Sequence, residues 1–374
     1  MSHTRGAWGK GAVSLSELIA RARRDVDEGV LPSCQVAVAR NGELLAWEGF
    51  GSVQGSRYTI FSITKALVAS AVWLLVSEEL LTFETRVSDL VPEFGEQNKE
   101  AVTVDHLLLH TAGFPRAPMR PEDGADPARR LERFASWHLD WAPGTQTEYH
   151  PTSAHWVLAE VIERASGLDF RTFVNERISA ELGLDFLRLG FDELDQRPIV
   201  DVAIVGEPAQ MGTIQRKSGE ELRIPEIRPD ILLRYNEPIV RAAGVPGAGA
   251  VGTAADVAML FQALMRNPDG LWKPEVLADA TGTVRNSFPD PHTTAAANRS
   301  RGLVLAGDDG MQLMRSFGEG VSPRAFASPG VGGQTAWADP ATGVSFCYLT
   351  NGIDSDLVRA FRRSMKLSTL ASAI

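Results

Sequence analysis

The sequence predicts an α+β fold, with an antiparallel sheet flanked by helices and an all-helical lobe inserted within the chain. Three observations predict it. Segments with strand character lie near both ends of the chain, whereas residues 82–190 show mainly helical spacing. The 374 residues also exceed what one hydrophobic core usually serves. We therefore expect an α/β lobe at residues 1–82 and 246–374, and a helical lobe with a cap region at residues 83–245.

The first expected elements are a helix, a hairpin and a second helix. Apolar residues recur at helical spacing over residues 15–30, which predicts an opening helix. Strand-like runs at residues 34–39 and 43–50 flank Asn41-Gly42, a dipeptide typical of a β-hairpin turn. A long apolar helix is then expected from Ser62 to about Leu81.

Caps, prolines and apolar runs mark the later elements. Thr103-x-Asp105 is expected to cap one helix, and Gly167 to end another at residues 152–166. The proline-dotted residues 190–245 are expected to form a cap over the cleft. After them we expect a helix at 254–265, strands near 302–306, 334–338 and 344–350, and a final helix at 354–370.

Charge and hydropathy argue against two kinds of partner. The chain has 37 basic and 47 acidic residues, and the resulting net charge of -10 argues against binding nucleic acid. Residues 1–13 lack the apolar core of a signal peptide, and the longest apolar stretch, residues 66–76, is too short to span a bilayer. We therefore expect a cytoplasmic protein with no membrane partner.

No cofactor and no metal are expected. Cys34 and Cys347 each lie in an apolar run, which fits buried thiols better than a disulfide or a metal site. His106 and His110 have i, i+4 spacing but lack a third ligand. Residues 247–252 match the glycine pattern of dinucleotide sites, yet no strand precedes them. We interpret them as a flexible turn that leads into the next helix.

The most informative functional signal is Ser62-x-x-Lys65 at the start of the apolar helix. At this spacing the two side chains share one helix face. A serine hydroxyl is a poor nucleophile until a base takes its proton, and an unprotonated lysine amine is such a base. The pair is also the nucleophile motif of penicillin-recognising serine enzymes.

Further segments, in the same order, resemble the serine β-lactamase and DD-peptidase superfamily. Residues 107–113, Leu-Leu-Leu-His-Thr-Ala-Gly, are similar to its leucine-rich His-Thr-Ser-Gly segment. Pro143-Gly144-Thr145 followed by Tyr149 resembles the stretch that delivers its catalytic tyrosine. Residues 328–333, Ser-Pro-Gly-Val-Gly-Gly, resemble its active-site edge strand. The resemblance covers about residues 30–370, missing chiefly residues 190–245. It is nearest to the class C β-lactamase-like branch, which includes the family VIII carboxylesterases.

This resemblance implies three catalytic residues. Ser62 would be the nucleophile that accepts the acyl group, at a helix N-terminus whose free N–H groups and dipole favour negative charge. Lys65 would take or relay its proton, and Tyr149 would be the partner general base. The sequence leaves open whether Lys65 or Tyr149 is the primary base. His110 is expected to be structural and to close a helix end near the cleft.

The resemblance also implies backbone and substrate contacts. The N–H groups of Ser62 and Val331 would form the oxyanion hole, and Gly330 would let backbone and substrate approach closely. His150, which follows the tyrosine, and Ser328 on the edge strand are expected to contact the substrate.

Two departures from the superfamily narrow the function. Pro151 stands where β-lactamases and DD-peptidases have a polar Asn, and Ser328 stands where they carry a cation that meets the substrate carboxylate. Such a site is expected to bind β-lactams and D-Ala-D-Ala ends poorly.

We therefore expect a serine hydrolase that forms an acyl-enzyme on Ser62, a carboxylesterase acting on small neutral esters, or an acyltransferase. The alternative is a β-lactamase, D-aminopeptidase or amidase of the same fold. A non-catalytic binding protein is disfavoured because Ser62, Lys65 and Tyr149 are all present.

Overall fold

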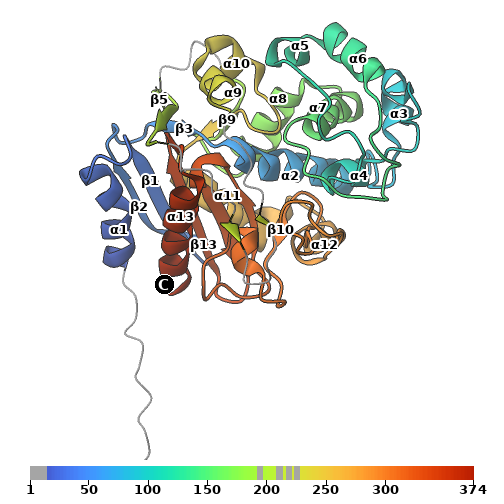
Figure 1. Ribbon diagram of the computed structural model, residues 1–374. Helices are drawn as coiled ribbons and strands as arrows, with labels where there is room; N and C mark the ends of the chain where they lie inside the picture. Colours follow the sequence, from blue (N-terminus) through green and yellow to red (C-terminus); the bar gives the residue numbers. More distant parts are fainter. Residues whose placement is uncertain (1–14, 192–196, 208–213, 216–220, 223–227) are drawn as a thin grey trace, which may run out of the picture.

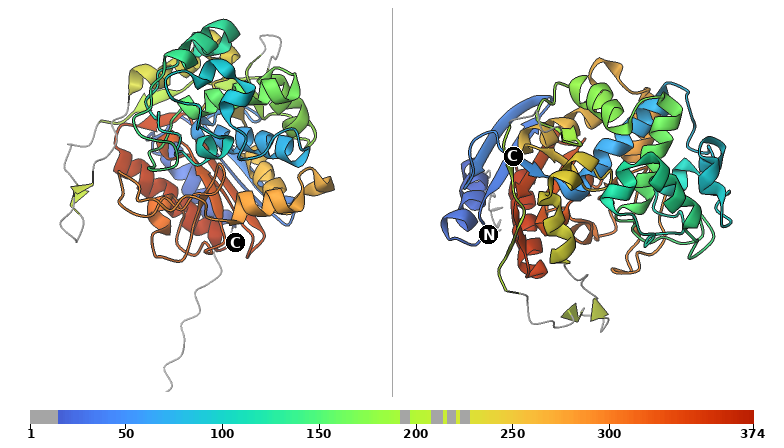
Figure 2. Two further views of the ribbon diagram at one scale, coloured as in Figure 1. Left: turned by 90° about the vertical axis from the view of Figure 1, so that its right-hand side faces the viewer. Right: turned by 90° about the horizontal axis from the view of Figure 1, so that it is seen from above.

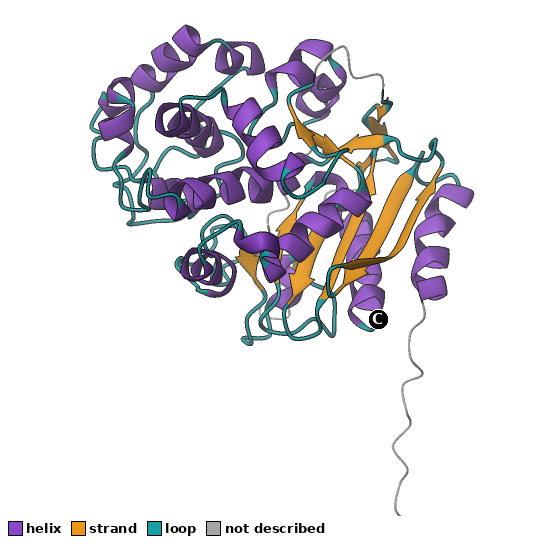
Figure 3. Cartoon of the chain, turned by 180° about the vertical axis from the view of Figure 1, so that it is seen from behind, coloured by secondary structure: helices purple, strands orange, loops and turns teal. Residues whose placement is uncertain are grey.

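The computed structural model describes residues 15–191, 197–207, 214–215, 221–222 and 228–374. Its largest sheet is antiparallel, with the strand order β10-β11-β12-β13-β1-β2 (Figure 3). The strands are β1 (Cys34–Arg40), β2 (Glu43–Phe50), β10 (Val304–Leu305), β11 (Phe326–Pro329), β12 (Thr335–Asp339) and β13 (Val344–Thr350). β1 pairs with β13, and Cys34 lies opposite Thr350. The two ends of the chain thus share one sheet, which confirms the predicted α+β class.

The turn between β1 and β2 is the predicted hairpin. Asn41 and Gly42 have φ angles of +55° and +91°. A type I′ turn requires positive φ at both central residues, and Asn and Gly tolerate it best. β1 is buried at every position before Arg40, whereas β2 is largely exposed at the edge of the sheet.

Helices cover both faces of the sheet. α1 (Leu15–Asp27) and α13 (Leu357–Ser372) pack on one face and against each other (Figure 1), and α11 (Ala254–Arg266) covers the other. Arg363 of α13 holds the first face together, because its guanidinium donates to Asp25 of α1 at 2.8 Å and to Asp354 at 3.0 Å. With both faces covered, the central strands are apolar along their length.

α2 (Thr64–Ser77) connects the sheet to the helical lobe. It is buried at every position except Val76, because it packs against both α7 (Ser153–Ser166) and α12 (Pro274–Gly282). The remaining helices of that lobe lie beyond α2 as seen from the sheet (Figures 1 and 2), namely α3 (Val87–Leu90), α4 (Val104–Leu108), α5 (Pro121–Ala125), α6 (Pro127–Ser136) and α8 (Phe170–Val174). Along the described ranges, no helix combines the length and apolar character that crossing a membrane requires.

Short strands and helices complete the molecule. β3 (Arg57–Thr59) pairs with β5 (Ile199–Val200) and β9 (Ala250–Gly252), and β9 also pairs with β4 (Arg188–Leu189). β6 (Ala203–Val205) pairs with β14 (Gly352–Asp354), and β7 (Ile214–Gln215) with β8 (Glu221–Leu222). α9 (Pro229–Leu232) precedes α10 (Pro238–Ala243), which packs on α5. The described parts of residues 190–245 are therefore joined both to strands and to the helical lobe.

Two predicted helices are shorter than expected, each for a local reason. α2 ends at Ser77 rather than near residue 81, because Glu79 adopts a left-handed φ of +62°. The helix capped by Thr103 has only five residues, because His110 adopts a φ of +59° two residues after its end. The Thr103 cap and the stop at Gly167, with a φ of +75°, lie where they were predicted.

Candidate active site

Ser62 lies in a 3₁₀ turn between β3 and the N-terminus of α2. The residue before it, Phe61, has a φ of +43°. This conformation costs a bulky residue about 1–2 kcal/mol and is found mainly at functional sites. Tyr235 holds Phe61 in place through an edge-to-face contact, with ring centroids 5.3 Å apart. The backbone geometry of the nucleophile turn is therefore consistent with a functional role, as the motif suggests.

Lys65, on the first turn of α2, is only 3% exposed. Its Nζ donates to Ser62 Oγ at 3.2 Å and to the carbonyl oxygen of Gly247 at 2.7 Å. Burial lowers the pKa of Lys65; Tyr149 opposes this shift and the charge of Arg299 adds to it. The lowered pKa favours the neutral amine, which is the form that accepts a proton.

Tyr149 reaches the same hydroxyl from the loop before α7. Its Oη lies 2.9 Å from Ser62 Oγ, and Lys65 Nζ lies 4.9 Å from its ring centroid. Burial raises the pKa of Tyr149, but the charge of Lys65, the hydrogen bonds with Lys65 and Ser62, and the charge of Arg299 together lower it below the ordinary value. The structure therefore brings the three predicted catalytic residues into direct contact.

The leucine-rich segment at residues 107–113 holds the tyrosine loop. His110 Nδ1 accepts a hydrogen bond from the His150 amide at 3.1 Å, and the His110 carbonyl accepts one from the Glu148 amide at 3.3 Å. These bonds lie on either side of Tyr149, whose ring centroid is 4.7 Å from that of His110. Burial keeps the pKa of His110 well below its ordinary value, so this ring is neutral. His110 is structural, as predicted, and it positions the tyrosine.

Strand β11, which contains Ser328, lies against the nucleophile turn. It was predicted to be the edge strand, but β10 pairs with it on the outer side. Ser328 Oγ donates to the carbonyl oxygen of Ser62 at 3.0 Å. At Gly330 a Cβ would lie 3.2 Å from the carbonyl oxygen of Ile60, so glycine permits the close approach of the two segments. Val331 follows as the first residue of a short 3₁₀ turn. The backbone of Val331 and that of Ser62 thus belong to adjoining segments.

Two residues that were predicted to contact the substrate have buried side chains that hydrogen-bond within the protein. His150 is fully buried; its Nε2 accepts from the Phe114 amide at 3.3 Å, and its Nδ1 lies 2.7 Å from the carbonyl oxygen of Glu148. It does not line the cleft. Ser328 is 5% exposed, and its hydroxyl is engaged with the backbone of Ser62. Both side chains bond to main-chain groups, as buried polar groups usually do.

Three neighbours of the catalytic residues were not predicted. Gly247 supplies a carbonyl to Lys65, Tyr235 supports Phe61, and the guanidinium carbon of Arg299 lies 5.3 Å from the ring centroid of Tyr149. The glycine-rich run was visible, and close backbone approach is one reason for such a run. No motif in the neighbouring sequence identifies Tyr235 or Arg299, because only the tertiary fold brings them to the active site.

The segments interpreted as non-catalytic have structural explanations. Residues 247–252 follow helix α10 rather than a strand, so the dinucleotide pattern lacks its βαβ unit. The expected flexible turn is only partly right, because residues 250–252 form strand β9. Cys34 and Cys347 are buried free thiols, and burial raises the pKa of Cys34 to about 12. Within the described residues, no group of three or more His, Cys, Asp or Glu side chains is placed to hold a metal ion.

The fold and this site define an active-site serine enzyme of α+β architecture. A family model described as Beta-lactamase matches residues 18–367. The chain belongs to the Beta-lactamase family, and the predicted superfamily membership is thereby confirmed.

Relatives in this family include proteins named as esterases. The chain is 30% identical over 277 residues to Esterase EstB of Burkholderia gladioli, a match covering 65% of this chain and 67% of EstB. It is 25% identical over 337 residues to Esterase/beta-lactamase LipL of Mycobacterium tuberculosis, covering 83% of this chain and 75% of LipL.

Solved structures share the fold. A family VIII carboxylesterase is 23% identical, with a TM-score of 0.74 over 96% of this chain and 99% of the other. A penicillin-binding protein homolog from Caulobacter crescentus is 24% identical, with a TM-score of 0.76 over 96% of this chain and 97% of the other. Both alignments span the sheet and the helical lobe.

Proposed function

We propose that the protein is a carboxylesterase that forms an acyl-enzyme on Ser62. The observation that carries this proposal is the position of Ser62 Oγ, 2.9 Å from Tyr149 Oη and 3.2 Å from Lys65 Nζ. Both neighbours have a lowered pKa, which favours the unprotonated form that takes the hydroxyl proton. The names of EstB and LipL support ester hydrolysis as the reaction class.

The chemistry follows from one nucleophile and one shared base. Tyr149 or Lys65 accepts the Ser62 proton as Oγ attacks the ester carbonyl carbon. The tetrahedral intermediate then breaks its bond to the alcohol, which leaves with that proton. In the second half, water gives a proton to the same base, attacks the acyl group, and releases the acid and the free Ser62 hydroxyl.

The backbone N–H groups of Ser62 and Val331 are proposed to bind the oxyanion of each intermediate. Two contacts support this role. The Ser328 hydroxyl joins β11 to the carbonyl of Ser62 at 3.0 Å, and Gly330 permits the close approach of the strand. The pair of donors is therefore held by a rigid strand and by a helix N-terminus.

The proline at position 151 favours an ester substrate over an amide substrate. A Cβ on Gly247 would lie 2.7 Å from the Pro151 carbonyl oxygen, so residue 151 packs against the glycine turn behind Lys65. Proline has no side-chain amide with which to read a peptide bond. The second candidate, β-lactam or amide hydrolysis, is favoured by the double name of LipL.

Hydrolysis of short-chain nitrophenyl esters tests the proposal. Ser62→Ala is expected to abolish turnover and labelling by a fluorophosphonate, because the nucleophile is gone. Lys65→Ala and Tyr149→Phe are expected to lower kcat/KM by about 10²–10⁴-fold, because each removes a proton acceptor. Ser136→Ala, on an exposed serine, is the matched control and should keep full activity.

Two results would contradict the proposal. Full ester hydrolysis by Ser62→Ala would show that another group is the nucleophile. Turnover of a chromogenic cephalosporin faster than that of any ester would favour the second candidate. Product analysis with an added alcohol separates hydrolysis from acyl transfer, because an acyltransferase forms a new ester at the expense of the acid.

A further inference from the structure

Arg299 places a positive charge beside the ring of Tyr149 in the active site. It lies between α12 and β10, and its guanidinium carbon is 5.3 Å from the ring centroid of Tyr149. In the described part of the chain, no carboxylate forms an ion pair with it and no group hydrogen-bonds its side chain. Both Arg299 and Tyr149 are half-buried, so a molecule in the site can reach them. An arginine remains protonated at any working pH.

The other arginines of this region all have acidic partners. Arg285 donates to Asp279 at 2.9 Å, Arg301 to Asp105 at 2.6 Å, and Arg315 to Asp309 at 2.7 Å. A cation that is partly removed from water is costly unless it is paired. The side chain of Arg299 is therefore available to pair with an anion that enters the site.

Arg299 is also held rigidly beside the tyrosine loop. Its backbone exchanges two hydrogen bonds with that of Asn286, each 3.0 Å long. The Asn286 side chain donates to the carbonyl oxygen of Leu109 at 2.8 Å and to Thr147 Oγ1 at 2.9 Å. Leu109 and Thr147 belong to the two segments that position Tyr149. The guanidinium is thus carried by a backbone that does not need to be ordered when a ligand binds.

We propose that Arg299 binds a carboxylate of the substrate, so that the preferred substrates are esters carrying a free carboxylate group. This proposal rests on the proposed esterase function. A guanidinium offers paired N–H donors that match the two oxygens of a carboxylate. Ser328 places no cation on strand β11. For that reason the sequence predicts neutral esters as substrates. Arg299 supplies a cation from a different segment.

Two pairs of esters test this proposal on the wild-type protein. Mono-4-nitrophenyl glutarate and its methyl ester differ in a charge and a methyl group on the acyl side. 4-Acetoxybenzoate and its methyl ester differ in the same way on the leaving group, where the ester also makes the phenol a better leaving group. We expect kcat/KM in at least one pair to favour the carboxylate by about tenfold or more, as a charge-assisted hydrogen bond provides.

The variants are compared by the ratio of kcat/KM for the two esters of a pair, which cancels any change in the catalytic base. Arg299→Met is expected to lose about tenfold in this ratio, and Arg299→Lys to keep part of it as a single point charge. Arg324→Met is the control, because Arg324 is exposed and belongs to another part of the molecule; its ratio should match the wild type. Thermal unfolding checks that each variant is folded.

The outcomes separate this proposal from the esterase proposal. Ser62-dependent hydrolysis with no preference for the charged ester in either pair overturns the carboxylate proposal alone. A preference that survives unchanged in both Arg299→Met and Arg299→Lys also overturns it. No hydrolysis of any of the four esters, together with no fluorophosphonate labelling of Ser62, overturns both proposals.

Discussion

Two basic side chains lie near the ring of Tyr149, with Lys65 Nζ at 4.9 Å and the Arg299 guanidinium carbon at 5.3 Å from its centroid. Burial alone would raise the pKa of this phenol and make it a poor base near neutral pH. The cations and the contact with Ser62 reverse the shift. At the scale of the residue, the charge around one hydroxyl therefore decides whether it accepts a proton.

This environment predicts how activity depends on pH. Arg299 lowers the pKa of both Tyr149 and Lys65. Its removal raises both, so a higher pH is needed to deprotonate either base. In Arg299→Met the rising limb of kcat/KM for a neutral ester is expected to move to higher pH, while Arg299→Lys moves it less. The measurement is a profile from about pH 6 to pH 10; an unmoved limb would contradict the assigned electrostatics.

Most of the catalytic residues could be predicted from the sequence, but their surroundings could not. Ser62 and Lys65 are three residues apart, so a local motif contains their whole geometry. Tyr149 required the order of several segments along the chain. Arg299 and Gly247 have no local signal, because their contacts are a carbonyl and a ring far away in sequence.

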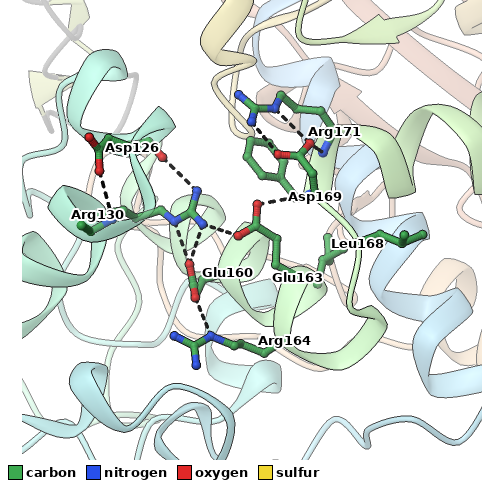
Figure 4. Close-up of polar contacts among 12 residues, drawn as sticks. Asp126, Arg130, Glu160, Glu163, Arg164, Leu168, Asp169 and Arg171 are labelled. Atoms are coloured by element: carbon green, nitrogen blue, oxygen red, sulfur yellow. Dashed lines mark hydrogen bonds and ion pairs between the residues drawn. The ribbon is translucent and has the colours of Figure 1, made fainter.

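At the scale of the element, a buried ion cluster joins α6 to α7 (Figure 4). Arg130 of α6 donates to Glu160 of α7 at 2.8 Å and also bonds to Glu163. Arg164 donates to the other oxygen of Glu160 at 2.7 Å. The side chains of Arg130 and Glu160 are 1% and 4% exposed. The cluster fixes α6 against α7, which in turn packs on the nucleophile helix α2.

Removal of one member of this cluster is predicted to destabilise the fold. Arg130→Met leaves the Glu160 and Glu163 carboxylates without their buried partner, and we expect a loss of about 3–5 kcal/mol in the free energy of unfolding. Arg116→Met, which breaks an exposed ion pair with Glu148, should cost less than about 1 kcal/mol. Denaturant unfolding measures both, and equal losses would show that burial does not govern the effect.

Elements were predicted well where the signal is local, and their ends less well. The Asn41-Gly42 hairpin follows from the φ preferences of two residues. The early end of α2 does not follow from such preferences, because Glu79 adopts the left-handed conformation there. Intrinsic propensity does not favour that conformation in a glutamate; the surrounding structure imposes it.

At the scale of the whole molecule, three buried histidines lie around the site. His110, His150 and His155 each have a pKa below the ordinary value, chiefly because burial disfavours the charged ring. For His150 the pKa falls to about 4. The unfolded chain therefore binds these protons more readily than the folded protein does.

The fold is accordingly predicted to lose stability in acid. The contribution of these rings is fully present above the unfolded pKa of about 6.5 and is lost as the pH falls toward the folded values. The lowered pKa of His150 alone corresponds to about 3 kcal/mol. Urea unfolding between about pH 8 and pH 4.5 measures the slope. His150→Asn should reduce the slope of unfolding free energy against pH. His138→Gln, on an exposed histidine, should leave the slope unchanged. A flat curve for the wild type would contradict the prediction.

The amino-acid sequence alone was enough to predict the fold class and the family, and to select Ser62, Lys65 and Tyr149 as the proposed catalytic residues. These follow from hydrophobic periodicity, turn residues and motifs, which are properties of short stretches of chain. Only the tertiary structure decided what surrounds that chemistry. His150 is buried in the core, Ser328 donates to the backbone of Ser62, and Arg299 lies beside the ring of Tyr149. The physical reason is that burial and charge depend on every segment packed around a group, and most of those segments are distant in sequence.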